Sequence, residues 1–135
     1  MSLINFEEQT EDLTELELKH LDEIKDFIMK SFINYGFIGT VKFHKKPIKQ
    51  DALTKHINSE LILKYGLFTP LKINSARLRK YFSYFRCNGI LPIIATKDGC
   101  YLSQDREEIE KQILSLEQRS RQIWKASEGM RKFLI

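Results

Sequence analysis

Apolar residues recur at helical spacing near the start of the chain. The recurring positions are Leu18, Leu21, Ile24, Phe27, Ile28 and Phe32. Thr14 followed by Glu17 is typical of a capping box at a helix start, and Gly36 is a helix stop. The pattern therefore predicts one helix from Thr14 to about Asn34. Residues 1–11 lack this periodicity, so residues 1–13 are expected to form a mobile acidic leader.

The pattern changes twice in the next stretch. Phe37–Phe43 is rich in aromatic and β-branched residues and is bounded by Gly36 and Pro47, which predicts a short strand. Helical spacing then returns from about Lys49 to Tyr65, and Gly66 is its stop. The apolar face of this second helix consists of Ala52, Leu53, Ile57 and Leu61.

A third helix is predicted from Asn74 or Ser75, as its cap, to Cys87, with Asn88-Gly89 as a strong stop. Leu78, Phe82 and Phe85 form a narrow apolar stripe on it. Successive helical side chains are about 100° apart, which leaves a second set on the opposite arc. That set is Ala76, Arg77, Arg79, Lys80, Ser83, Tyr84 and Cys87, which includes three cations and no acid.

A hairpin and a long helix complete the predicted elements. Ile90–Thr96 and Cys100–Leu102 are apolar runs joined by Lys97-Asp98-Gly99, and Asp-Gly between such runs is a strong hairpin signal. Ser103 is expected to cap the last helix. Three acids occupy the first turn of that helix, where negative charge suits the helix dipole: Asp105, Glu107 and Glu108.

Composition favours one compact domain. The chain has 135 residues, of which 42% are apolar and 30% charged. We expect a domain over residues 14–116 and a helical extension over residues 117–135. The longest uncharged stretch, Ser31–Val41, is far shorter than the roughly 20 apolar residues that cross a bilayer, which predicts a cytoplasmic protein without membrane contact.

Charge is strongly segregated along the chain. Residues 1–30 carry three lysines against nine acids, a net of −6. Residues 42–86 carry eleven cations against two acids, a net of +9, and residues 87–135 carry eight cations against seven acids. A basic block in a folded domain is typical of a surface that faces a polyanion, although a solvated lysine-rich surface is the plainer alternative.

The order helix, strand, helix, turn, helix, hairpin is that of a winged helix-turn-helix domain. Residues 73–116 also match a more specific sequence motif. The matching positions are Phe85, Arg86, Asn88, Gly89, Leu91–Thr96, Gly99, Tyr101, Leu102, Glu107–Leu116 and, just beyond, Arg119. Through them the chain resembles the winged-helix proteins that bacteriophages and related mobile elements encode. Two departures are Cys100, between the wing glycine and tyrosine, and the long Leu67–Ile73 loop. The fold class is therefore expected to be α+β, mainly helical, with a small β wing and long N- and C-terminal helices.

The resemblance implies binding to double-stranded DNA, as a transcription regulator or a replication accessory protein. On the third helix the candidate contacts are Ser75, Arg77, Arg79, Lys80, Ser83 and Tyr84, with Arg77 and Lys80 as the best base readers. Candidate backbone contacts are Lys97 at the hairpin tip and Lys42, Lys45, Lys46 and Lys49 before the second helix. A solvated helix face is the alternative for Arg77 and Lys80. Tyr81 and Tyr84 could pack on the sugar-phosphate backbone, although partial burial beside Phe82 and Phe85 is the favoured role for Tyr81.

The last helix supports a rival hypothesis. Alternating four- and three-residue steps form a heptad seam over Ile109, Ile113, Leu116, Ser120, Ile123, Ser127, Met130 and Leu134. Such a seam could make a homodimer, or its first half could pack on the first helix. If protein contacts dominate, the chain is an assembly or adaptor protein of a virion or replication complex, with a phage or host protein as partner.

Other chemistry has little support in the sequence. The three histidines, His20, His44 and His56, are scattered, and no glycine-rich phosphate loop or catalytic triad spacing is present, so we expect neither an enzyme nor a cofactor. Cys87 and Cys100 lack the spacing of a disulfide framework or a zinc knuckle and are expected to be free thiols. A stacking platform for single strands is a minor alternative, because Phe82 and Phe85 belong to the apolar stripe.

Overall fold

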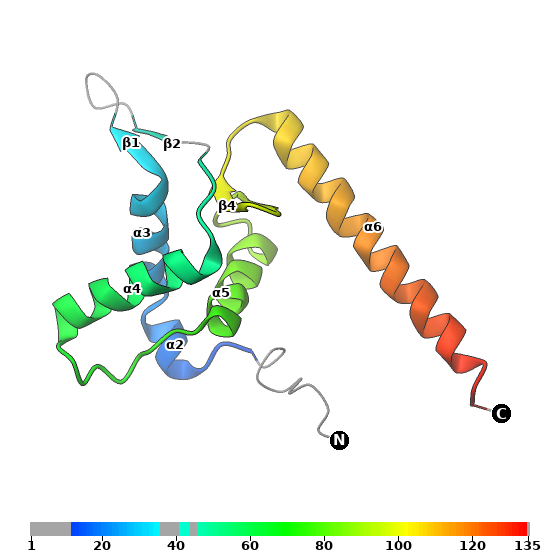
Figure 1. Cartoon of the computed structure of the whole chain (residues 1–135), viewed down its shortest axis with the longest axis horizontal. Helices are drawn as coiled ribbons and strands as arrows, with labels where there is room; N and C mark the ends of the chain where they lie inside the picture. The colour runs from blue at the N-terminus through cyan, green and yellow to red at the C-terminus, as the bar shows by residue number, and fades with distance from the viewer. Residues whose placement is uncertain (1–11, 36–40, 44–45, 135) are drawn as a thin grey trace. The chain divides into compact units, whose positions relative to one another are not determined.

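The computed structural model describes residues 12–35, 41–43 and 46–134, with side chains described for 12–33 and 46–134. The chain divides into two units, one ending at Ser103 and the other beginning at Gln104, and each is described by itself. The first unit contains, in order, α2 (Glu15–Lys19), α3 (Leu21–Phe32), β1 (Ile33–Tyr35), β2 (Val41–Phe43), α4 (Gln50–Tyr65), α5 (Ser75–Cys87), β3 (Ile93–Thr96) and β4 (Gly99–Leu102) (Figure 1). The second unit contains α6 (Arg106–Arg131). The fold is α+β and mostly helical, with small antiparallel sheets.

The capping box at Thr14 is confirmed. The backbone N–H of Glu17 donates to Thr14 Oγ1 at 3.2 Å, and the Glu17 carboxylate accepts from the Thr14 N–H at 2.9 Å. The single long helix is wrong, however, because the backbone leaves helical geometry at His20, which separates α2 from α3. The His20 ring is hydrogen-bonded to Glu23 at 3.2 Å, so local side-chain bonding supports the break.

The end of this helical segment also differs from the prediction. Ile33–Tyr35 forms β1 and pairs antiparallel with β2, with Ile33 opposite Phe43. A helix through Asn34 would leave β2 without this partner, and pairing with β2 overrides the helical periodicity. The predicted strand Phe37–Phe43 is confirmed over Val41–Phe43, and its residues 37–40 lie outside the described part of the chain.

The two middle helices match their predictions. α4 begins after Lys49 and ends at Gly66, which has a φ of 90°, a value that glycine adopts without strain. Leu53, Ile57 and Leu61 are buried as expected, whereas Ala52 is exposed. α5 begins after Asn74, whose side chain accepts from the Arg77 N–H at 2.8 Å.

The linker between these helices returns along α4 (Figure 1). Asn58, in the middle of α4, donates to the Ile73 carbonyl at 2.7 Å and accepts from the Ile73 N–H at 3.0 Å. Ser75 Oγ then donates to Asp51 Oδ1 at 3.0 Å. The start of α5 is therefore beside the first turn of α4 rather than beside its last, because the long loop covers the intervening distance.

The core is formed by residues from α3, α4, α5 and the β3–β4 hairpin, and Leu16 of α2 packs against it partly buried. The fully buried large side chains are Ile24, Ile28, Phe32, Leu53, Ile57, Leu61, Leu78, Tyr81, Phe85 and Leu102. The predicted apolar stripe of α5 is thus confirmed, since Leu78, Phe82 and Phe85 are all buried. The hairpin is confirmed as well, with Thr96 opposite Gly99 and Ile93 opposite Leu102.

A backbone bridge attaches the segment before α4 to the hairpin. Ile48 and Cys100 exchange both N–H···O=C bonds, each at 2.9 Å. Gly99 sits against the Ile48 backbone, where a Cβ would collide with the Ile48 carbonyl. Gly99 has a φ of 131°, so both its conformation and its surroundings require glycine.

The second unit begins earlier than expected. The helix is continuous from Arg106 to Arg131, and the division falls after Ser103 rather than after residue 116. Its cap is Asp105, whose carboxylate accepts from the Glu107 N–H at 2.9 Å, and not Ser103, which is buried. No α6 residue is buried, and Leu134 lies beyond the helix end. No helix among the described residues is long and apolar enough to span a membrane.

Candidate nucleic-acid interface

One side of α5 is buried in the core. The rest of its surface has three parts: one bonded to α2 through Arg77, one bordering a pocket, and one exposed to solvent. The buried side is completed by Tyr81, whose hydroxyl donates to the Glu17 carbonyl at 2.8 Å. Burial raises the pKa of Tyr81, and the nearby Glu17 carboxylate adds to that effect. Tyr81 is fully buried, which confirms the predicted burial of this residue.

Arg77 does not lie on an open face, which corrects the prediction of a base-reading position. Its Nε donates to Glu17 Oε2 at 2.9 Å, its Nη2 contacts Glu17 Oε1, and its side chain is only 13% exposed. Arg77 also donates to the Asp12 carbonyl at 3.1 Å. Burial by itself would raise the pKa of Glu17, but the hydrogen bonds from Arg77 and Thr14 and the Arg77 charge lower it. Arg77 therefore attaches α5 to α2 instead of facing solvent.

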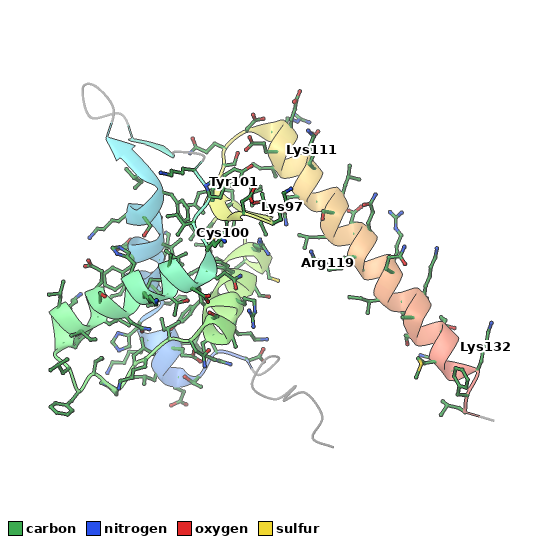
Figure 2. The ribbon with its side chains drawn as sticks, viewed as in Figure 1. Lys97, Cys100, Tyr101, Lys111, Arg119 and Lys132 are labelled. Carbon is green, nitrogen blue, oxygen red and sulfur yellow. The ribbon has the colours of Figure 1, made fainter. Side chains whose placement is uncertain are left out.

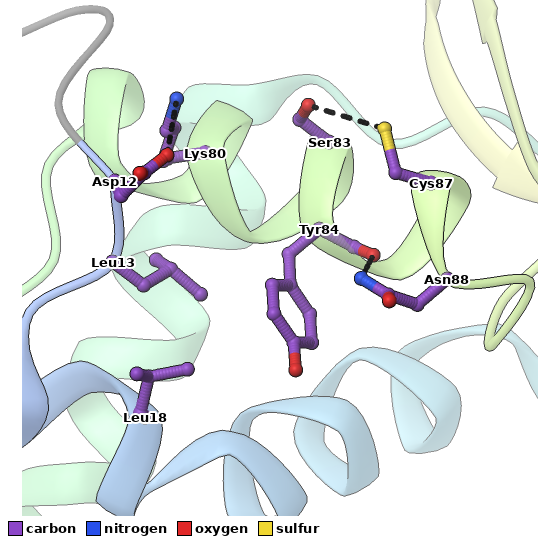
Figure 3. A pocket seen from close by; sticks show the side chains of 8 residues that line it. All are labelled: Asp12, Leu13, Leu18, Lys80, Ser83, Tyr84, Cys87 and Asn88. Atoms are coloured by element: carbon purple, nitrogen blue, oxygen red, sulfur yellow. Dashed lines mark hydrogen bonds and ion pairs between the residues drawn. The ribbon is translucent and has the colours of Figure 1, made fainter.

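Lys80, Ser83 and Tyr84 border an open pocket of 410 Å³ between α5 and the residues around α2 (Figure 3). Lys80 Nζ lies 3.7 Å from Asp12 Oδ1, and Tyr84 faces Leu13 and Leu18 across the pocket. The predicted outward arc is thus divided: Lys80 and Tyr84 border this pocket, and neither is fully exposed.

The part of α5 that stays open to solvent centres on Arg79 and Ser83, which are both exposed. Arg79 Nη1 donates to Gln50 Oε1 at 3.3 Å, so the side chain lies beside the first turn of α4. Ser83 Oγ is 3.9 Å from Cys87 Sγ. Ser75, which is half-buried, is hydrogen-bonded to Asp51 at the same end of α5.

The lysines before α4 and at the hairpin tip flank this open part. Lys46 and Lys49 are exposed on either side of Ile48, which is bonded to Cys100 of β4. Lys97 is exposed in the turn between β3 and β4 (Figure 2). The side chain of Lys42, and all of Lys45, lie outside the described residues. We call Lys46, Lys49, Arg79 and Lys97 the basic surface.

The basic surface keeps its positive charge largely uncompensated. Within the part of the chain that the structure describes, none of its four members makes an ion pair with a carboxylate. The nearest acids along the chain are Asp51, which is bonded to Ser75, and Asp98, beside Lys97. Three segments that are distant in sequence thus each expose cations without an ion-pair partner among the described residues.

Three contacts fix the relative position of these segments. The Ile48–Cys100 bridge joins the lysine segment to β4, and the bond from Arg79 to Gln50 joins α5 to α4. Arg86, at the end of α5, donates to the Ile93 carbonyl at 3.2 Å, which attaches β3 to α5. The arginine of the sequence motif therefore positions the hairpin.

The two cysteines are free and differ in their surroundings. Cys87 is exposed, whereas Cys100 is buried in β4. Burial raises the pKa of the Cys100 thiol to about 11, and the Arg86 charge offsets part of that shift. Among the described residues no three His, Cys, Asp or Glu side chains are grouped so that they could hold a metal ion.

The sequence did not reveal three features of this region. The sequence pattern places Glu17 in the capping box and gives no sign that its carboxylate also binds Arg77. Nothing in the spacing connects Gln50 to Arg79, although their side chains are hydrogen-bonded. The Ile48–Cys100 bridge pairs residues 52 positions apart, and an isolated isoleucine beside Pro47 is too short a signal for a strand.

No protein-family model, curated protein or solved structure matches this chain.

Proposed function

We propose that the first unit binds double-stranded DNA through the basic surface, with α5 as the reading helix and the β3–β4 hairpin as a wing. The observation that carries the proposal is that three segments with exposed cations, Lys46 and Lys49, Arg79, and Lys97, are joined by the Arg79–Gln50 bond and the Ile48–Cys100 bridge. Arginine can make two hydrogen bonds to guanine in the major groove, while lysines contact phosphates without reading sequence. Arg79 takes the role of base reader that was predicted for Arg77 and Lys80.

The connectivity supports a winged-helix interpretation. The Ile48–Cys100 bridge adds the segment between α3 and α4 to the edge of the hairpin, next to β4. Lys49, the N-cap residue of α4, makes no side-chain capping bond, so the first N–H groups of α4 are without that cap. A helix N-terminus flanked by lysines is typical of a phosphate contact. A phage or mobile-element transcription regulator or replication accessory protein fits these features.

A titration of labelled duplex against the full chain at several salt concentrations tests the proposal. We expect the affinity to fall steeply as salt rises, because bound lysines and arginines release counterions from the phosphates. Arg79→Ala should weaken binding by roughly tenfold to a hundredfold, and Lys49→Ala should lower the salt dependence by about one phosphate contact. Lys30→Ala is the matched control, since Lys30 is an exposed lysine of α3 outside the basic surface.

Two results would contradict DNA binding. One is an affinity that does not change with salt. The other is equal binding by the Arg79→Ala, Lys49→Ala and Lys30→Ala variants.

A second candidate function, an assembly or adaptor role, rests on a different surface. The end of α4 and the start of the following linker expose Ile62, Leu63, Tyr65, Leu67 and Phe68. Phe68 is 98% exposed, and adjacent large apolar residues in solvent are typical of a protein-binding patch. This function would be favoured by two results together. The first is failure of the DNA titration, and the second is a higher solubility of Phe68→Ser than of the parent chain, because the substitution removes an exposed apolar side chain.

A further inference from the structure

α6 presents an apolar seam to solvent along most of its length. Within the helix the seam is Ile109, Ile113, Leu116, Ser120, Ile123, Ser127 and Met130. Ile123 is 64% exposed and Met130 is 66% exposed. Exposed apolar residues that repeat at alternating steps of three and four positions are typical of one helix of a coiled coil.

The charges on α6 are divided between its two halves. From Asp105 to Gln118 there are five acids and two bases, a net of −3, whereas from Arg119 to Lys132 there are five bases and one acid, a net of +4. Lys111 lies in the first half, and Arg119 and Lys132 lie in the second (Figure 2). A partner helix running in the opposite direction would place unlike charges together, and a parallel copy would place like charges together.

We propose that α6 pairs with α6 of a second copy of this chain in antiparallel orientation. The heptad positions define one symmetric register, centred midway between Arg121 and Gln122. In this register Ile113 packs against the partner's Met130, and Leu116 packs against the partner's Ser127. This inference is independent of DNA binding.

The two serines favour this orientation over a parallel one. In a parallel pair Ser120 would face the partner's Ser120, and Ser127 would face the partner's Ser127, so two layers of the interface would be entirely polar. In the antiparallel register Ser120 faces the partner's Ile123 instead. A serine in such a layer can donate its hydroxyl to a carbonyl of its own helix, which satisfies the polar group.

The residues beside the seam agree with the same register. Glu110 follows the seam position Ile109 and lies opposite the partner's Arg131, which follows Met130. This contact occurs twice in a symmetric dimer. Trp124 follows Ile123, is 62% exposed in one copy, and would be partly covered by the partner.

Sedimentation equilibrium and tryptophan emission on the full chain test self-association. Trp124 is the only tryptophan of the chain, so its emission reports on α6 alone. We expect a dimer at high micromolar concentration, with an emission maximum that moves to longer wavelength as dilution dissociates it. A monomer at all concentrations would overturn the proposal.

Ile123→Glu should weaken the dimer by about a hundredfold, because a carboxylate in a seam layer has no partner there. Leu114→Glu is the matched control, since Leu114 is an exposed leucine of α6 outside the seam. Equal dimers from Ile123→Glu and from the parent chain would show that another surface associates.

A charge exchange and a cross-linking experiment test the orientation. Glu110→Arg should weaken self-association by roughly threefold to tenfold, and adding Arg131→Glu to the same chain should restore it. For cross-linking, Cys87→Ser removes the exposed native thiol, and Ile113→Cys and Met130→Cys are made in separate chains. We expect oxidation to give a disulfide dimer only when the two chains are mixed. Cross-linking of each chain with itself would indicate a parallel pair and overturn the antiparallel assignment.

Discussion

α5 and α6 carry similar alternations of apolar and polar residues, and the structure treats them differently. α5 buries four side chains, Leu78, Tyr81, Phe82 and Phe85, among α3, α4 and the hairpin. α6 is twice as long and buries none. Helical periodicity therefore predicts that a helix forms and which face is apolar, but the elements available around it decide whether that face is covered.

The largest expected difference between the two helices concerns aromatic truncation. Phe85→Ala should lower the free energy of unfolding of the first unit by about 3–5 kcal/mol, because Phe85 is fully buried. Trp124→Ala should change that free energy by less than about 0.5 kcal/mol, since Trp124 is an exposed residue of α6. All five tyrosines lie in the first unit, so urea unfolding followed by tyrosine circular dichroism measures it separately. Equal losses in the two variants would break the distinction.

Ion pairs should show a smaller difference of the same kind. Arg77→Ala leaves the Glu17 carboxylate buried without its cation, which should cost about 2–3 kcal/mol of unfolding free energy. Arg106→Ala in α6 is the matched control, because the Arg106–Glu110 pair is exposed and contributes about 0.5 kcal/mol or less. If both substitutions have the same effect, the Glu17–Arg77 pair is not structural.

The same pair predicts a pH dependence. The pKa of Glu17 is lowered from 4.5 in the folded state, so its contribution to stability is complete above that pH. It is lost as the pH falls through the lowered folded value. The parent chain should therefore lose more stability than Arg77→Ala on acidification, as measured by urea unfolding at a series of pH values. Parallel pH profiles would contradict the assignment.

The smallest expected difference in stability between the first unit and α6 concerns one glycine in each. Gly99→Ala should destabilise the first unit by about 1–3 kcal/mol, because the residue needs a positive φ and an added Cβ collides with Ile48. Gly129→Ala meets no atom within 4 Å and lies inside α6, so it should raise helix stability by up to about 1 kcal/mol. Urea unfolding for the first variant and far-ultraviolet circular dichroism for the second give the two signs. A stabilising Gly99→Ala would refute the close approach of Ile48.

The sequence predicted best the elements that end at strong local signals. Gly66, Asn88-Gly89 and Asp98-Gly99 placed the ends of α4, α5 and the hairpin turn within a few residues. β1 was missed because Ile33 and Tyr35 continue an apolar helical period, and only the partner strand reveals the alternative. The periodicity of one segment contains no information about the strand that pairs with it, even when that strand follows closely along the chain.

The candidate site was predictable in composition and less so in detail. Arg79, Lys46 and Lys49 are exposed as the charge pattern suggested. The position of Arg77 depends on Glu17, which is 60 residues away, and a helical projection of α5 contains no information about that carboxylate. Cations that pair within the fold and cations that face solvent have the same sequence signature.

The two hydrogen bonds between Asn58 and the Ile73 backbone have a consequence for how this chain tolerates insertions. They set the entry point of α5 from the middle of α4, while Gly66, Leu67 and Phe68 remain exposed at the outer end of the loop. Closing a longer loop costs little additional entropy. Extra residues grafted between Gly66 and Phe68, such as a peptide tag or a protease site, therefore leave the register of α5 in place, and the outer end of this loop is a natural location for new sequence.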